Sequence, residues 1–308
     1  MVTIVNGRTT MTVLANHRRI VVGVDGSANS LGATRWAASV ASQLNLPLHI
    51  LCAMEFALSA YREFDLSSAG DWDGQMLAAS GAIANEAEKA ALAWCPDIEV
   101  STEISGDFVA RALLTASDHA RMLVVGQSGL GSVGGALVGS TTQYVVDQAG
   151  CSVVVWRGGG GDEPGRGPVV VGVDGSELST RAVDEAFGFA AAFGAPVIAV
   201  HTWSGVLTAG VFKIPLMLDW DAVKAAEAAV LSEGLAGKSE QYPEVAVQRI
   251  LRDANPAGTL MHVSDAAQLI VVGSRGHTGL LGALAGSTSR NLLYHAKTPV
   301  MICRAPRI

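Results

Sequence analysis

The chain has 308 residues, enough for about two ordinary domains with a core each. Its composition, 49% hydrophobic and only 16% charged, excludes a disordered protein. The formal net charge of −7 argues against a nucleic-acid-binding protein, which would normally present a basic surface.

Nothing in the sequence is typical of a membrane or secreted protein. No uninterrupted apolar segment approaches the roughly 20 residues that a membrane-spanning helix needs. Polar residues interrupt every apolar run of residues 1–17, which we interpret as a loose leader and not as a targeting signal. The cysteines are scattered without a C-x-x-C pair, which favours reduced thiols over a zinc site or a disulfide framework. We therefore expect a cytoplasmic protein that does not associate with membranes.

The first predicted strand and the turn that follows it occur twice in the chain. The sequence IVVGVDGS at residues 20–27 recurs as VVVGVDGS at residues 169–176. The tripeptide Asp-Trp-Asp at residues 71–73 recurs at residues 219–221. Because both repeats lie about 150 residues apart, they indicate one domain that has been duplicated.

A glycine-rich loop also occurs in both copies, each time directly after a short apolar run. GQSGLGSVGGALVGST begins at Gly126, and GSRGHTGLLGALAGST begins at Gly273. The two copies share the pattern G-x2-G-x9-G-[ST]. A Walker loop would need a lysine that neither copy has, and the dinucleotide fingerprint at Gly129, Gly131 and Gly134 occurs in the first copy alone. The shared pattern is therefore the more specific signal.

The boundary between the copies is visible in the composition. Residues 158–161 are four consecutive glycines, and acidic, proline and glycine residues follow. Such a segment has no side chains to pack and is typical of a flexible linker. We predict one domain at residues 18–157, a linker at 158–167 and a second domain at 168–308.

Each copy alternates strand and helix patterns. Short apolar strands separated by helices predict a parallel sheet that is covered on both faces, so we expect two doubly wound, Rossmann-like α/β domains in tandem. Acidic Asp219 and Asp221 favour a helix start, and we expect Trp220 to be buried there. In the second copy we predict strands at 169–173, 197–200, 245–251, 269–272 and 300–303, and helices at 179–193, 220–237, 256–267 and 287–295.

The glycine loops are candidates for a phosphate site. Ligands of doubly wound sheets bind beyond the carboxyl ends of the strands, where these loops begin. Glycine lets backbone N–H groups approach an anion, and the Gly-Ser-Thr step opens a helix whose first N–H groups favour phosphate. Two alternatives stay open: Asp25 and Asp174 would serve only the turn after the first strand, and the glycines would serve only close packing.

These residues resemble the universal stress protein family. The motif V-G-V-D-G-S, the pattern G-x2-G-x9-G-[ST] and a final strand that closes each unit carry the resemblance, which covers nearly all of residues 18–304. A tandem of two such domains is one of the family's forms. Because the glycine pattern marks the members that bind ATP, the resemblance implies up to two adenine nucleotides per chain, with or without Mg²⁺.

The resemblance also implies roles for individual residues. The carboxylates at the end of the first strand would meet ribose and adenine, backbone after the second strand would meet adenine, and two valines would border the base. The glycine loop and the helix start would hold ribose and phosphates. The implied residues are Asp25, Ala53, Val125, Gly126, Gly129, Gly139, Ser140 and Thr141 in the first copy, and Asp174, Thr202, Val272, Gly273, Gly276, Gly286, Ser287 and Thr288 in the second.

Three further expectations concern the surroundings of these sites. The segments 54–76 and 203–219 leave the same sheet edge and are candidates to cover the nucleotide. Arg275 and His277 stand near the second phosphate position, so we expect tighter ATP binding there. We expect His201 to be a hydrogen-bonded packing residue and not a ligand.

We expect a binding protein rather than an enzyme, because the sites show no nucleophile–base pair. It would be a nucleotide-dependent regulator in a stress or dormancy response, acting on an unidentified protein partner. The alternatives are a slow ATPase or nucleotidyl-transfer enzyme, and a partner-binding protein with a structural nucleotide. The last strands, 152–156 and 299–303, resemble those that pair units in the family, and here we expect them to pair the two halves with each other. We therefore expect a pseudo-symmetric monomer or a homodimer.

Overall fold

The computed structural model describes residues 19–54, 72–129, 138–158, 164–165, 167–203, 219–276 and 286–305. Most of both predicted cover segments, the linker glycines after Gly158, and His277 lie outside these residues. In the described part of the chain, no helix is long and apolar enough to cross a membrane.

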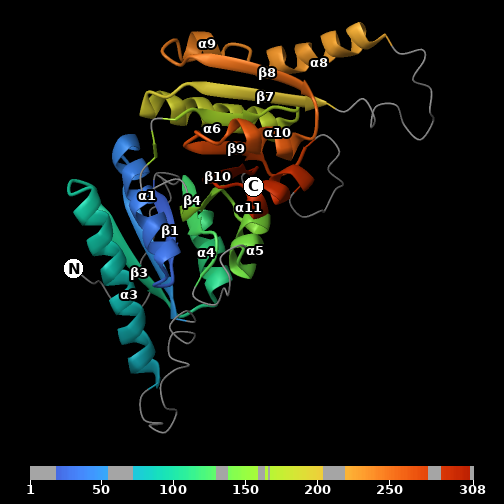
Figure 1. Ribbon diagram of the computed structural model, residues 1–308. Coiled ribbons are helices and arrows are strands. Elements are labelled where there is room, and N and C mark those ends of the chain that lie inside the picture. The colour runs from blue at the N-terminus through green and yellow to red at the C-terminus, as the bar shows by residue number, and fades with distance from the viewer. Residues whose placement is uncertain are drawn as a thin grey trace.

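Ten strands of the described residues form one sheet (Figure 1). They are β1 (Ile20–Val24), β2 (Leu48–Ala53), β3 (Val100–Ser105), β4 (Met122–Gly126), β5 (Ser152–Trp156), β6 (Val169–Gly172), β7 (Val197–Trp203), β8 (Val247–Asp253), β9 (Leu269–Gly273) and β10 (Val300–Cys303). The order across the sheet is β3-β2-β1-β4-β5-β10-β9-β6-β7-β8.

The order shows two copies of one doubly wound unit, as predicted. Within each half all neighbouring strands are parallel, and the first strand of the half lies between the second and the fourth. The two halves meet where β5 pairs with β10 in antiparallel register, with Met301 opposite Val154. The expectation that the last strands pair the halves is therefore confirmed. Accumulated strand twist turns the strands of one half steeply against those of the other (Figure 1).

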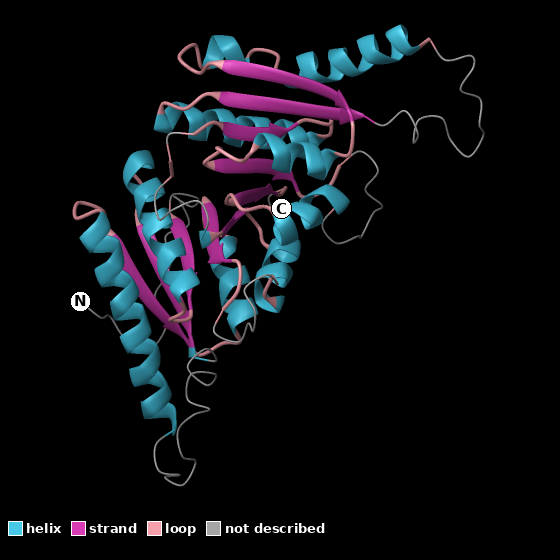
Figure 2. Cartoon of the chain, viewed as in Figure 1, coloured by secondary structure: helices cyan, strands magenta, loops and turns pink. Residues whose placement is uncertain are grey.

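Helices cover both faces of the sheet (Figure 2). Their buried side chains form two apolar clusters, one on each face, which is why the central strands are apolar throughout. One face carries α1 (Ala28–Leu44), α3 (Trp72–Trp94), α6 (Glu177–Phe193) and α8 (Trp220–Gly234). The other face carries α4 (Val109–Ser117), α5 (Ser140–Gln148), α10 (Pro256–Val263) and α11 (Ser287–His295), and the short α9 (Lys238–Gln241) follows α8 along the chain.

Several predicted bounds differ from those observed. The helix expected at 220–237 ends at Gly234, and the chain then turns at Gly237, which has a φ of 73°. The helix expected at 256–267 ends at Val263, and the strand expected at 245–251 begins at Val247.

The expected burial of Trp220 is wrong. Asp219 caps α8 as its position suggested, since its side chain accepts from the backbone N–H of Asp221 and Ala222. Trp220 is nevertheless 41% exposed. Its ring lies beside that of Trp203, the last residue of β7, at a centroid distance of 6.1 Å.

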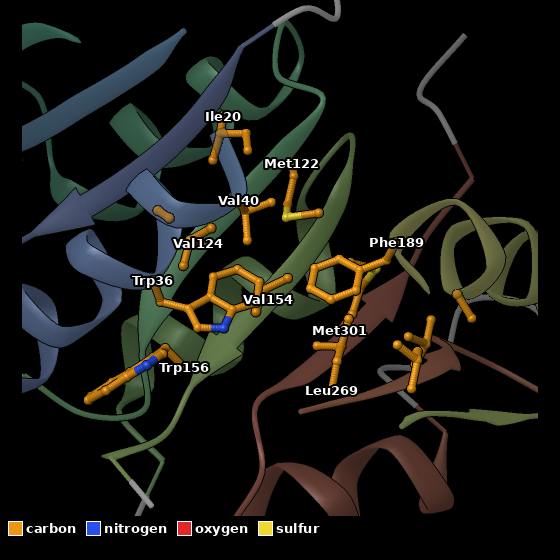
Figure 3. Close-up of a cluster of buried hydrophobic side chains, with 14 of the residues drawn as sticks. Ile20, Trp36, Val40, Met122, Val124, Val154, Trp156, Phe189, Leu269 and Met301 are labelled. Atoms are coloured by element: carbon orange, nitrogen blue, oxygen red, sulfur yellow. The ribbon is translucent and has the colours of Figure 1, made fainter. Parts of the chain in front are cut away.

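The two halves share one core. Trp36 of α1 stacks on Phe189 of α6 at a centroid distance of 6.1 Å, and Met122, Val154 and Met301 lie around them (Figure 3). Both apolar clusters contain buried residues of both halves. The continuity of sheet and core shows that the domains are packed together and not merely linked.

Polar contacts flank this shared core. Arg121 donates two hydrogen bonds to Glu185 across the halves, at 2.7 and 2.6 Å. The hydroxyl of Tyr294 in α11 donates to Oε1 of Gln143 in α5 at 2.9 Å. These contacts fix the register in which the two halves face each other.

Candidate functional site

In each half, the predicted site residues gather at the carboxyl ends of the strands, which we call the sheet edge of that half. The strand order reverses between β1 and β4 in the first half and between β6 and β9 in the second. Doubly wound domains bind their ligands at the carboxyl ends of the strands beside such a reversal. Asp25 follows β1 and Asp174 follows β6, while the glycine loops leave β4 and β9 at the same edges.

The first-strand aspartate makes the turn into the next helix. Oδ1 of Asp25 accepts from the N–H of Ser27 at 3.0 Å and from its hydroxyl at 2.6 Å, and Gly26 between them has a φ of 82°. Ser27 then caps α1, since its hydroxyl oxygen accepts from the N–H of Ser30. Oδ1 of Asp25 therefore serves the turn, as the first alternative expected.

The second half repeats this turn with the same distances. Oδ1 of Asp174 accepts from the N–H and the hydroxyl of Ser176 at 3.0 and 2.6 Å. Gly175 has a φ of 78°, and Ser176 caps α6. Repetition of this detail shows that the motif V-G-V-D-G-S encodes one local structure.

The second carboxylate oxygen faces the glycine loop. A methyl group on Gly129 would collide with Oδ2 of Asp25, and one on Gly276 would collide with Oδ2 of Asp174. The structure thus brings together two motif residues that lie about a hundred positions apart in the chain. Only glycine leaves room for the carboxylate at this position, and Asp25 is 5% exposed.

The base of each glycine loop is closed by a backbone hydrogen bond. The N–H of Gly139 donates to the carbonyl of Gln127 at 2.9 Å, and the N–H of Gly286 donates to the carbonyl of Ser274 at 2.7 Å. The stretches 130–137 and 277–285 between these points lie outside the described residues. Directly after these hydrogen bonds, α5 and α11 begin.

Both helices that follow the glycine loops begin at a glycine. Gly139 and Gly286 are the N-cap residues of α5 and α11, and neither helix has a side-chain cap among the described residues. Their φ values of −62° and −60° suit any residue. A methyl group would lie 3.6 Å from Cα of Ser128 or 3.5 Å from the carbonyl oxygen of Ser274, which are ordinary contacts. Neither backbone conformation nor packing against the described residues therefore requires glycine at these positions.

The first glycine of each loop has a different neighbour. A methyl group on Gly126 would lie 3.2 Å from Cβ of Asn29, and one on Gly273 would lie 3.0 Å from Cβ of Leu178. These glycines let the loop cross the start of α1 or α6 closely. The alternative in which glycine serves packing therefore accounts for this position, whereas no close contact with a described residue supports it at the helix starts.

The remaining predicted residues also lie at these edges. Ala53 ends β2, Thr202 lies at the end of β7, and buried Val125 and Val272 precede the loops. The first turns of α5 and α11 contain Ser140, Thr141, Ser287 and Thr288, none of which is buried. In each half, the described residues predicted for base, ribose and phosphate thus share one sheet edge.

One polar contact at the first loop was missed. Nδ2 of Asn29 donates to the carbonyl of Ser128 at 3.1 Å and to its hydroxyl at 3.0 Å. Leu178 stands at the corresponding place in the second half, so the two loops are held differently. The sequence carried no signal for this contact beyond the difference between the copies.

A hydrogen-bonded histidine lies beside the second site. His201 is 5% exposed, as befits the packing residue that we predicted. Its Nδ1 lies 2.6 Å from the carbonyl oxygen of Val173, and its Nε2 lies 2.7 Å from Oε2 of Glu227. Within the described residues, no group of three or more His, Cys, Asp or Glu side chains is arranged to hold a metal ion.

Comparison with known proteins identifies the family. The Universal stress protein family matches residues 16–157 and 165–304. A universal stress protein of Mycobacterium tuberculosis is 35% identical over 291 residues, which cover 92% of this chain and 96% of the relative. A solved universal stress protein from Archaeoglobus fulgidus superposes with a TM-score of 0.67 at 17% identity, covering 93% of this chain and 98% of the other.

The same family includes a nucleotide complex. The structure of a universal stress protein has been solved with cAMP. That protein is 27% identical, and the match covers 45% of this chain and 97% of the other, with a TM-score of 0.31.

Both halves match the family, the relative spans nearly the whole chain, and the fold agrees over both units. The chain belongs to the universal stress protein family, as a tandem of two of its domains.

Proposed function

We propose that the chain binds ATP at both glycine loops and acts as a nucleotide-dependent regulator in a stress or dormancy response. One observation carries the proposal: within the described residues, Gly139 and Gly286 begin helices without a side-chain cap, although their conformation and their packing allow other residues. Space and uncapped N–H groups at a helix start suit a phosphate.

The neighbouring groups suit the rest of an adenine nucleotide. Asp25 and Asp174 present a carboxylate at the sheet edge, and a carboxylate there accepts hydrogen bonds from ribose hydroxyls. Backbone groups of Ala53 and Thr202 lie at the ends of β2 and β7, where adenine would be held. The chain would thus hold up to two adenine nucleotides.

Binding is favoured over turnover. The described residues offer one carboxylate beside each glycine loop, and hydrolysis would need a positioned base or metal as well. Mg²⁺, if it accompanies ATP, would be bound largely by phosphate oxygens and water, with few protein ligands. Nucleotide occupancy would then act through an unidentified protein partner that distinguishes the loaded chain from the empty one.

The first test is the nucleotide content of the purified protein, measured by acid release and chromatography. Two ATP per chain are expected from two working sites with slow or absent hydrolysis. Titration calorimetry of the stripped protein, with and without Mg²⁺, then measures uptake. Asp25→Asn and Asp174→Asn should each remove one site. A chain that neither carries nor takes up nucleotide would overturn the proposal.

The same titration compares the halves. Arg275 in the second glycine loop occupies the position that Ser128 occupies in the first loop. A cation near phosphate strengthens binding, by roughly 1.5–3 kcal/mol for a charged hydrogen bond. We expect the site that remains in Asp25→Asn to bind ATP more tightly than the site that remains in Asp174→Asn. Equal or reversed affinities would contradict this expectation.

A further inference from the structure

We propose that His201 is a positioning residue that preorganises the nucleotide site of the second half and has no counterpart in the first. The proposal rests on the proposed function of that site and names a group through which its affinity is set. His201, Glu227 and the carbonyl of Val173 form the contact, which we name the histidine latch.

The latch joins three elements through one buried ring. His201 lies in β7, Glu227 in α8, and Val173 directly after β6. The ring meets the Val173 carbonyl at 2.6 Å and the Glu227 carboxylate at 2.7 Å, and Glu227 keeps only 22% of its side-chain surface exposed. Because a carbonyl oxygen only accepts, Nδ1 carries a proton that points at Val173.

The proton on Nδ1 decides the chemistry of the other nitrogen. Nε2 then either carries a second proton and donates to the Glu227 carboxylate, or accepts from a protonated carboxyl group. In both cases one hydrogen bond joins the ring to the carboxyl group, and it is charge-assisted when the ring carries the second proton. The contact therefore ties α8 to β7 whichever partner holds that proton.

Both residues that the latch holds stand next to predicted nucleotide ligands. Val173 precedes Asp174, whose carboxylate makes the turn and faces Gly276. His201 precedes Thr202, whose backbone is predicted to meet adenine. The latch therefore fixes the end of β6 against the end of β7, which sets the distance between the ribose side and the base side of the site.

Helix α8 is attached near the site by this contact and by two apolar ones. The helix lies wholly within the described residues, and Leu231 is its buried residue. A methyl group on Gly234 would lie 2.7 Å from Cγ1 of Val173, so the end of α8 packs closely against Val173. Val173 is also the residue whose carbonyl contacts the His201 ring. The start of α8 contacts β7 through Trp220 and Trp203. Glu227 supplies the polar contact between these two apolar ones.

The first half is built differently at this place. Cys52 occupies the position in β2 that His201 occupies in β7, and its thiol donates to the backbone carbonyl of the adjacent Ala53 at 3.9 Å. Helix α3 packs on the sheet through the buried alanines Ala84, Ala87 and Ala91. A helix that packs through small apolar residues needs no ionic contact. The latch is therefore a feature of the second half.

A site whose parts are held before the ligand arrives loses less conformational freedom on binding. Removing the latch should therefore weaken ATP binding in the second half and leave the first half unchanged. The test uses the full chain with Asp25→Asn, in which titration reads the second site alone. Glu227→Ala in this background is expected to weaken ATP binding about tenfold, whereas Glu227→Gln should bind nearly as wild type. The amide of glutamine can donate to Nε2 and so preserves both hydrogen bonds of the ring.

The control places Glu227→Ala in the Asp174→Asn background, where titration reads the first site and affinity should not change. Equal weakening of both sites would show general destabilisation and overturn the proposal, as would an unchanged second site. Amide exchange at residues 173–176 and 197–203, measured without nucleotide, should rise in Glu227→Ala and not in Glu227→Gln. If the wild-type chain bound no ATP, the proposed function would fail, and this exchange measurement would still decide whether the latch holds the turn.

Discussion

Gly126, Gly129 and Gly139 belong to one sequence pattern, but the structure gives each a different neighbour. Gly126 lies against the start of α1, and Gly129 lies against the carboxylate of Asp25. Gly139 meets only ordinary contacts at the start of α5. The first two positions are explained by the fold of the chain itself, and the third is where we propose that the phosphate binds.

This distinction predicts the behaviour of alanine variants. Gly139→Ala and Gly286→Ala should lower the free energy of unfolding by only about 1 kcal/mol or less, because glycine is slightly better than alanine at an N-cap. Each should nevertheless weaken ATP binding at its own site about tenfold or more, since the methyl group enters the space proposed for phosphate. Thermal unfolding and titration calorimetry measure the two effects separately. Gly129→Ala is the comparison, and it should lose stability as well.

The cysteines predict a second residue-scale result. Burial raises the pKa of Cys52 to about 11 and that of Cys151 to about 12, and it raises the pKa of Cys303 as well. At pH 8 these thiols contain much less reactive thiolate than an ordinary cysteine. Iodoacetamide should therefore modify half-buried Cys95 first and the other three only after unfolding. Peptide mapping of the folded chain checks this order, and rapid labelling of Cys151 would contradict it.

At the residue scale, the sequence predicted the repeated features and, for the contacts found in one half alone, did not identify the partners. The approach of Asp25 to the glycine loop followed from a motif that occurs twice. The bonds from Asn29 to Ser128 and from His201 to Glu227 each occur in one half alone. Each joins residues that no local pattern connects, so only the packed structure reveals them.

Among the elements, α5 shows how the halves are joined. The guanidinium of Arg304, which follows β10, donates to the carbonyl oxygens of Val146 and Ala149 at 2.7 and 2.9 Å. These carbonyls belong to the last turn of α5 in the other half, where a cation is favoured. Arg157 follows β5 in the same way, but its Nε and Nη2 have no hydrogen-bond partner in the described part of the chain, although the residue is 6% exposed. Burial lowers the pKa of Arg157 to about 10.

The two arginines should therefore respond oppositely to substitution. Arg304→Ala should lower the free energy of unfolding by about 1.5–3 kcal/mol, because hydrogen bonds from a charged donor are lost. Arg157→Met should raise it by about 1–3 kcal/mol, because an uncompensated buried charge is replaced by an apolar side chain of similar length. Urea unfolding of both variants measures the difference. A loss of stability in Arg157→Met would show that the guanidinium has a partner in solution.

The elements themselves were predicted well where the pattern had clear ends. Helix α11 and β10 have the predicted bounds, because a glycine N-cap and a short apolar run define them. The end of α10 was predicted four residues too late, since apolar Ala266 and Ala267 continue the helical pattern beyond Val263. Edge strand β8 was displaced because its half-exposed residues lack the apolar run of a central strand.

The whole molecule behaves as one sheet with one shared core, although the sequence shows two domains and a linker. The apolar cluster that contains Trp36 of the first half also contains Phe187 and Phe189 of the second. Pairing of β5 with β10 continues the sheet through the boundary. We therefore expect the two halves to unfold in a single transition.

A core substitution in one half tests this cooperativity. Phe187→Ala should lower the free energy of unfolding by about 3–5 kcal/mol, because a fully buried aromatic ring is removed. Hydrogen exchange should then increase in β1 and β4 as well as in β6 and β9. Calorimetry should still show one peak. Two separate peaks, with the first half unaffected, would mean that the halves unfold independently.

The antiparallel pairing of β5 with β10 has a consequence for assembly. Because β5 and β10 run antiparallel where the halves meet, the carboxyl ends of the strands point in opposite directions in the two halves. The two glycine loops, which begin at these strand ends, therefore lie on opposite sides of the junction. A partner that recognises one loaded loop would leave the other loop accessible. A chain with both sites filled would be a bivalent connector, able to hold two partner molecules apart at a fixed spacing and to gain avidity for any partner that is itself multivalent.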